Sequence, residues 1–161
     1  TFQPLEGEWE GAFDLRVDDR EPVARPVLLV IRSKDAGRLC EIEMRVEGQD
    51  GMAPLNYTFS HSLVDSGERV FTISDPKTGR GDGEGFVTES SHNPAAQEWK
   101  AAIRFPFTND RGLMEGLWHR KGDDLYSRSH DQFLIPDGTN HMFADMRLRR
   151  RAPTSPSTAS R

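Results

Sequence analysis

The chain has 161 residues, of which 35% are hydrophobic and 29% are charged, and its formal net charge is −5. This length fits one domain with its own core, and so polar a composition requires much of each secondary-structure element to face water. The negative charge argues against a general nucleic-acid binder, since such proteins carry a basic surface. Cys40 is the single cysteine, which excludes an intrachain disulfide and a cysteine-based metal cluster.

The segment 8–17 alternates strictly between the two faces of an extended chain. Trp9, Phe13 and Leu15 fall on one side, and Glu8 and Glu10 on the other. Because successive side chains of a β-strand point to opposite faces, this pattern predicts a strand with one buried and one solvated face. We expect Trp9, Phe13 and Leu15 to point inward.

The same period of two continues along most of the chain, without the spacing of an amphipathic helix. Clusters of Gly, Pro, Asp and Asn separate the alternating segments, as is typical of turns. Short strands at even spacing predict an all-β fold, a single antiparallel up-and-down barrel of about eight to ten strands. The expected strands after the first are 27–32, 38–47, 56–64, 69–74, 85–89, 98–107, 113–120, 125–135 and 141–149.

The barrel domain is expected to span 1–151. Residues 152–161 are rich in Ser, Thr and Pro, with no apolar residue beyond Ala, and predict a disordered tail. No apolar run approaches the length of a membrane span, which predicts a soluble protein without one. We expect a cytoplasmic location; because the chain begins at Thr1 and not at Met, removal of an export signal is the alternative.

Gly7-Glu8-Trp9 at the head of the first strand resembles the Gly-x-Trp opening of the calycin superfamily, which includes lipocalins, fatty-acid-binding proteins and nitrobindin-like barrels. The meander of short strands and an arginine on the last strand, Arg147 or Arg149, add to the resemblance. In lipocalins such an arginine packs over the first-strand tryptophan and closes one end of the barrel. The resemblance therefore implies a lipocalin-like barrel and a ligand held in its interior.

From the apolar and aromatic positions we predict a binding module for a small apolar or aromatic ligand that carries one polar group. We expect no metal and no resident cofactor, although haem is a second alternative, with His61, His119 or His130 as its axial ligand. The predicted lining is Trp9, Phe13, Met44, Tyr57, Phe59, His61, Trp99, Phe105, Trp118, Asp131 and Met142.

The first alternative is a small cofactor-independent barrel enzyme, such as an isomerase, cyclase or lyase. A symmetric turn at Lys121-Gly122-Asp123-Asp124 would bring several acid–base groups to one face of a hairpin. Together with His61, the candidate catalytic residues would be Glu115, His119, Tyr126 and His130, and Arg128 would share the same hairpin face.

The orientation of this hairpin separates the two hypotheses. Burying a side chain such as Met114 is favourable by roughly 1.5–3 kcal/mol, and the larger Trp118 adds to this. Turning the hairpin over would instead bury charged groups that must then be paired. We therefore predict that Trp118 and Met114 point inward. Ser127, Ser129 and Asp131 would then line the interior, with Asp131 as the main partner of the ligand's polar group.

Overall fold

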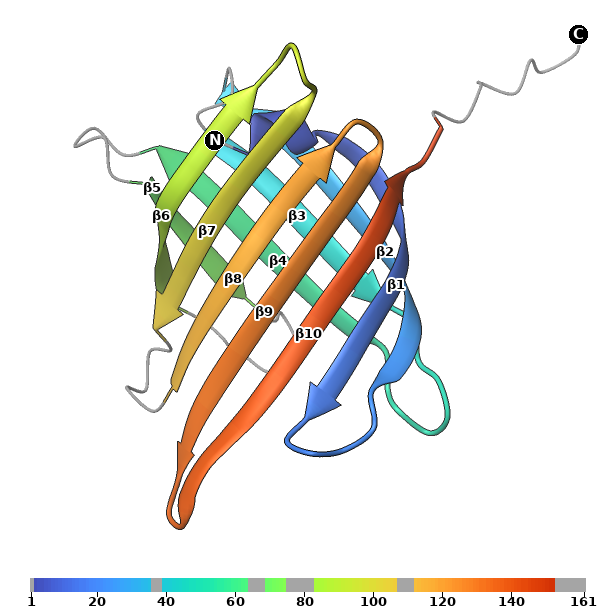
Figure 1. The fold of residues 1–161 in the computed structure, drawn as a ribbon, viewed down its shortest axis with the longest axis vertical. Coiled ribbons are helices and arrows are strands. Elements are labelled where there is room, and N and C mark those ends of the chain that lie inside the picture. Colours follow the sequence, from blue (N-terminus) through green and yellow to red (C-terminus); the bar gives the residue numbers. More distant parts are fainter. Residues whose placement is uncertain (1, 36–38, 64–68, 75–82, 107–111, 153–161) are drawn as a thin grey trace, which may run out of the picture.

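The computed structural model describes residues 2–35, 39–63, 69–74, 83–106 and 112–152, and in these ranges the side chains at 57, 59–63, 69–74 and 83–84 are not described. Ten strands within the described residues form a closed barrel (Figure 1). They are β1 (Gly7–Val17), β2 (Val23–Lys34), β3 (Leu39–Val46), β4 (Leu55–Leu63), β5 (Arg69–Ser74), β6 (Gly83–Asn93), β7 (Glu98–Pro106), β8 (Gly112–Lys121), β9 (Asp124–Ile135) and β10 (Gly138–Arg150).

Each strand pairs antiparallel with its neighbours in the chain, and β1 closes the barrel by pairing with β10. The predicted all-β, up-and-down antiparallel barrel is thus confirmed. A short 3₁₀ helix, η1 (Gln3–Leu5), precedes the first strand. The predicted disorder of the tail falls on 153–161, which lie outside the described residues.

β2 and β6 extend furthest beyond the strands that the sequence pattern predicts. β2 begins at Val23, four residues before the apolar run at 27–31. The sequence pattern did not predict this first part of the strand, because an inward arginine and an exposed proline interrupt the apolar alternation there. β6 continues to Asn93 through a polar stretch that faces solvent. A register shift between Val87 and Glu89 changes the phase of that strand, and so the period of two is lost there.

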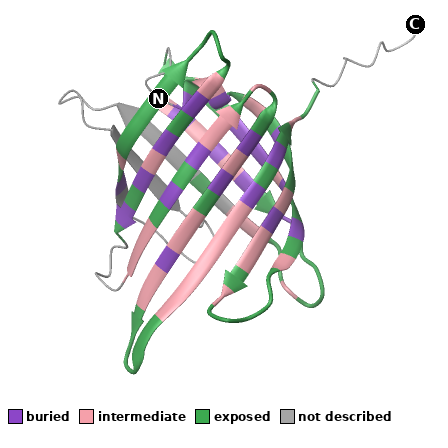
Figure 2. Cartoon of the chain, in the orientation of Figure 1, coloured by how far each residue is buried: buried purple, intermediate pink, exposed green. Residues whose placement is uncertain are grey.

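The core lies inside the barrel, and along β3 and β7 buried side chains alternate with more exposed ones (Figure 2). Trp9 and Phe13 point inward as predicted, and Leu15 is half-buried against the core. Cys40 is also buried, which agrees with its position on the apolar side of β3. Burial raises the pKa of the Cys40 thiol to about 11, so this side chain behaves as a small hydrophobe.

One end of the barrel, which we call the plugged end, is filled by η1. This end holds the first residue of β1, the β8–β9 turn and the last residue of β10. Phe2 and Leu5 are buried there, and the Phe2 ring lies 5.0 Å from Trp99 and 5.9 Å from Trp118. Trp9 Nε1 donates a 2.7 Å hydrogen bond to the carbonyl of Leu5, which ties η1 to the barrel wall.

Two arginines complete the plug around the Trp9 ring. The Arg150 guanidinium lies 4.3 Å from the ring centroid, and its Nη1 donates to the Glu6 carbonyl at 2.6 Å. Arg120 lies 6.0 Å from the same ring and donates to the carbonyls of Pro4 and Gly122. Stacking of a guanidinium on an aromatic face adds a cation–π attraction to the packing of the two side chains.

The predicted partner of Trp9 was wrong by one position on the last strand. Arg147 and Arg149 are exposed on the outer face, and Arg150 covers the ring. In the β1–β10 ladder Trp9 lies directly opposite Arg150, and residues directly opposite each other share a face. The even-numbered positions of β10 therefore point inward.

We expect the Trp9→Ala variant to lose about 3–5 kcal/mol of unfolding free energy, because it removes the largest fully buried side chain and the platform for Arg150. Urea unfolding followed by circular dichroism measures the loss. Leu117→Ala, at a position that is 57% exposed, is the matched control and should change stability by no more than about 0.5 kcal/mol. Equal losses of unfolding free energy in the two variants would contradict the stabilising role that we assign to Trp9 at the plugged end.

Candidate functional site

The β8–β9 hairpin has the predicted register and orientation. Lys121 pairs with Asp124 across the turn, and the pairing continues through Trp118 opposite Ser127. Trp118 is buried in the core and Met114 packs against it, whereas Glu115 is exposed. The prediction that Trp118 and Met114 face inward is confirmed, and burial of apolar area on this face explains it.

The same register places a polar strip on the inner face of β9. Ser127 and Asp131 are buried, and Ser129 between them is half-buried, as the predicted orientation requires. Asp131 lies opposite two methionines, Met114 on β8 and Met142 on β10. A carboxylic acid in such surroundings has lost most of its contact with water, which disfavours its charged form.

Asp131 is the acid of this strip. Burial raises the pKa of its carboxyl from 3.8 to about 7, and a hydrogen bond from Ser129 only partly offsets this. Its Oδ1 is buried and has no hydrogen-bond partner among the described residues. Near neutral pH, therefore, both protonation states are populated, and the group can donate or accept a hydrogen bond.

Arg25 on β2 is a functional candidate that the sequence analysis missed. Its side chain is 3% exposed, and it lies opposite Phe13 with the guanidinium 5.9 Å from that ring. Nη1 donates to the Ala53 carbonyl at 3.0 Å, while Nε has no partner among the described residues. The sequence contained a signal for this position, because Arg25 lies two residues before Val27 and residues two apart on a strand point to the same face.

The end opposite the plug, which we call the open end, carries the turns at 18–22, 47–54 and 136–137. Half-buried inward side chains gather towards it on β1, β8, β9 and β10, whereas Val46 and Phe105 at the same end are buried. The half-buried ones include Leu15, Met114, Ser129, Met142 and Ala144. Figure 2 shows that the parts of β8, β9 and β10 that lead away from the plug are mostly of intermediate burial. The inner wall is therefore partly exposed to solvent at this end.

The predicted catalytic candidates on the hairpin are on the outer wall and are held in separate pairs. His119 Nε2 lies 2.7 Å from Glu98, Glu115 lies 3.7 Å from Arg104, and the Tyr126 hydroxyl donates to Asp145 at 3.1 Å. Arg128 also donates to Asp145. Burial raises the pKa of the Asp145 carboxyl, but the hydrogen bonds from Arg128 and Tyr126 outweigh it, so that the pKa is lower than usual. These groups share a face, as predicted, and two of them, His119 and Tyr126, line one hollow on the outer wall; Glu115 and His130 do not line it.

His130 belongs to a stacked group on the same outer wall. Its ring is parallel to Phe143 at 4.4 Å, and its Nε2 lies 2.9 Å from Nδ1 of His141. Since His119 and His130 both face away from the interior, neither can be an axial ligand for a haem held inside the barrel. The side chains of His61, Tyr57 and Phe59 are outside the described side chains, so their predicted roles stay predictions.

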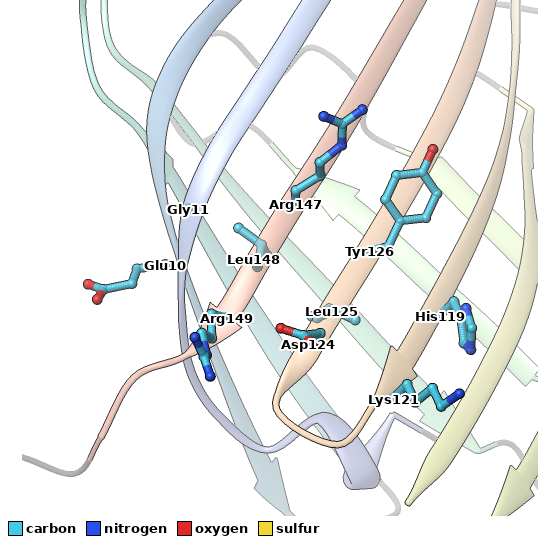
Figure 3. Close-up of a pocket in the computed structure, with 10 residues that line it drawn as sticks. All are labelled: Glu10, Gly11, His119, Lys121, Asp124, Leu125, Tyr126, Arg147, Leu148 and Arg149. Carbon is cyan, nitrogen blue, oxygen red and sulfur yellow. The ribbon is translucent and has the colours of Figure 1, made fainter.

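A hollow of about 520 Å³ lies on the outer wall near the plugged end (Figure 3). It is shallow and open to solvent, and neither Asp131 nor Arg25 lines it. Gly11 lines it, and because a Cβ there would meet the Arg147 carbonyl oxygen at 2.0 Å, the backbones of β1 and β10 approach closely at this position. Its lining is formed by Glu10, Gly11, His119, Lys121, Asp124, Leu125, Tyr126, Arg147, Leu148 and Arg149.

Comparison with known proteins identifies a fold and no family. No family model matches the chain, and no curated protein is similar to it in sequence. The crystal structure of Rv2717c from M. tuberculosis superposes with a TM-score of 0.63 at 13% identity, covering 94% of this chain and 97% of that one. BF2706 from Bacteroides fragilis aligns with a TM-score of only 0.22 at 6% identity, over 92% of this chain and 98% of that one. Among the described residues no helix is long and apolar enough to cross a membrane.

The buried Asp131 should make stability depend on pH in a characteristic direction. Its folded-state pKa of about 7 exceeds the ordinary 3.8, so the folded chain binds the extra proton between these values. The contribution of Asp131 to the unfolding free energy is therefore fully present at low pH. It falls as the pH rises from about 4 to 7, by at most about 1.4 kcal/mol per pH unit.

Urea unfolding at pH 5, 6.5 and 8 tests this expectation with Asp131→Asn. The variant should gain stability relative to the unmodified chain as the pH rises, because it keeps the neutral form throughout. Glu115→Gln, at an exposed carboxylate on the neighbouring strand, is the control and should follow the unmodified chain. Parallel pH profiles for Asp131→Asn and the unmodified chain would mean that the carboxyl is not buried.

Proposed function

We propose that this protein binds a small molecule with an apolar or aromatic body and a polar group, which enters the barrel through the open end. The observation that carries the proposal is Asp131, a buried carboxyl with an unsatisfied oxygen, set in an inner wall of methionine and aromatic side chains. Buried polar groups in folded proteins almost always have partners, and an exception indicates a ligand or water that completes the set.

The inner wall offers both kinds of contact that such a ligand needs. Phe13, Met44 and Met142 supply apolar area, and Ser127, Ser129 and Asp131 supply hydrogen-bonding groups on one strand. Small-molecule sites are mostly apolar with a few polar groups that fix orientation, and methionine side chains adapt to varied shapes. Trp9 and Phe105 are completely buried and support the wall from within the core.

Of the predicted lining residues, those towards the open end are therefore our candidates for direct contact. We assign direct contact to Phe13, Met44, Asp131 and Met142. Trp9, Trp99 and Trp118 would instead form the floor beneath the ligand, where η1 and the two plug arginines close the barrel. Phe105, which is buried opposite Met114 on the wall towards the open end, supports that wall. A lipocalin-like relationship fits this arrangement, since the Trp9–Arg150 stack is the contact that the calycin resemblance implies, one residue further along the strand.

The outer position of the acid–base residues favours binding over the alternative of a barrel enzyme. Catalysis by Glu115, His119, Tyr126 and His130 requires them to reach one substrate in a cavity that excludes water. They are instead paired with other surface groups on the outer wall.

The role of Asp131 can be tested by titrating the protein with medium-chain fatty acids and alcohols, aromatic acids and retinoids while tryptophan fluorescence is recorded. At least one class should bind, and Asp131→Ala should weaken it by about 5-fold to 100-fold, which corresponds to 1–3 kcal/mol for a lost buried hydrogen bond. His119→Ala removes an outer-wall side chain and should leave the affinity unchanged. Loss of affinity in His119→Ala alone would move the site to the outer wall.

A further inference from the structure

His130 and His141 form a pair on the outer wall, on the part of β9 and β10 that leads to the open end. His130 Nε2 lies 2.9 Å from Nδ1 of His141, and the planes of the two rings are inclined by 22°. In the β9–β10 ladder His130 is directly opposite Phe143, so His141 is its diagonal neighbour on the same face. Both side chains are half-buried. Two imidazole nitrogens therefore meet at a place that solvent can reach.

Contacts beyond their shared hydrogen bond restrict both histidines. The His130 ring is parallel to the Phe143 ring at 4.4 Å, and the Arg16 guanidinium lies 4.5 Å from that Phe143 ring. The backbone of His141 is bonded twice to Asp18: its N–H donates to Asp18 Oδ1 at 2.9 Å, and its carbonyl accepts from the Asp18 N–H at 2.8 Å. Groups held in this way lose little conformational freedom when they bind an ion.

The spacing of the two nitrogens is close to that of a metal chelate. Zn–N bonds are about 2.0–2.1 Å long, and two such bonds at a tetrahedral angle put the nitrogens roughly 3.3 Å apart. Nε2 of His130 and Nδ1 of His141 are at 2.9 Å. Small rotations of the two rings would therefore admit an ion in place of the hydrogen between them. Neutral imidazole is a preferred ligand of zinc and copper.

The β9–β10 register, and not the spacing along the chain, creates this pair. The two histidines are 11 residues apart, a spacing that matches no metal-binding motif, and the sequence analysis therefore expected no metal. Of the other histidines with described side chains, His119 faces the Glu98 carboxylate and His92 is exposed on β6. His130 and His141 are thus the only two imidazoles in contact among the described side chains.

The pair supplies two protein ligands and leaves the other positions of an ion to water. No three His, Cys, Asp or Glu side chains in the described part of the chain are grouped so that they could hold an ion together. The charges nearby are mixed, with Asp18 and Glu115 negative and Arg16 and Arg104 positive. The affinity must therefore come from the two imidazoles. Such an open site differs from a structural zinc site, in which four protein ligands surround the ion.

We propose that His130 and His141 bind a divalent d-block cation, Cu²⁺ or Zn²⁺, on the outer wall of the barrel. In the free pair one of the two facing nitrogens carries the hydrogen of their bond. On binding, that ring moves its hydrogen to its other nitrogen, so that both facing lone pairs are left for the ion. This site is separate from the interior site of the proposed function and does not depend on it.

Calorimetric titration of the full chain at pH 7.5 with CuCl₂, ZnCl₂ and MgCl₂ tests the site. Cu²⁺ and Zn²⁺ should each bind once per chain, with Cu²⁺ the tighter, and Mg²⁺ should not bind, because it requires oxygen ligands. His130→Gln and His141→Gln should each weaken Cu²⁺ binding by about 10-fold or more. His92→Gln removes an exposed histidine and is the matched control, with unchanged affinity. Absence of binding by both Cu²⁺ and Zn²⁺, or unchanged affinity in both pair variants, would overturn the proposal.

A second measurement needs no variant. Bound Cu²⁺ broadens the NMR signals of nuclei close to it. Substoichiometric CuCl₂ should therefore broaden the imidazole signals of His130 and His141 before those of His92 and His119. Broadening that begins at any other histidine would overturn the assignment.

Discussion

The stack of Arg150 on Trp9 is the contact on which the rest of the barrel depends. It joins the first strand to the last, where β1 and β10 close the ring, and Trp9 also fixes η1 through the Leu5 carbonyl. The pairing of Trp9 with Arg150 sets the register of the β1–β10 ladder, and a slip by one residue would turn every side chain of β10 to the other face. The position of Met142 on the inner wall follows from this register.

Closing one end gives the barrel two chemically different halves. The plugged half is filled with tryptophan, leucine and isoleucine side chains and holds its two arginines against backbone carbonyls. The half near the open end keeps half-buried methionine and alanine on its wall, together with Asp131 and Arg25. Each of these two polar side chains has a buried atom without a partner among the described residues. The half near the open end is the one in which we propose that the ligand binds.

Much of this fold could be predicted from the sequence, because period-two alternation reports directly which face of a strand is buried. The inward orientation of Trp9 and Trp118 followed from that rule, as did the interior position of Asp131. The arginine that covers Trp9 was predicted to be Arg147 or Arg149 and is Arg150. Which arginine faces Trp9 depends on the pairing register of β1 and β10, and the alternation within one strand does not reveal that register. Arg25 was missed because its strand was started at Val27, where the apolar run begins.

The candidate site could be predicted only in part, since a ligand-binding wall and an ordinary core use the same residue types. Trp99 and Met142 are equivalent in the sequence pattern, yet the first is buried against η1 and the second is half-buried near the open end. That difference depends on which end of the barrel is plugged, and the plug is formed by η1, for which the sequence analysis found no signal.

Native mass spectrometry of the purified protein tests the central claim, that the half near the open end holds a small molecule, most directly. The account predicts a non-covalent adduct on the unmodified chain that is retained in His119→Ala and is depleted in Asp131→Ala. An adduct that survives in Asp131→Ala and is lost in His119→Ala would contradict it, because the ligand would then occupy the outer wall.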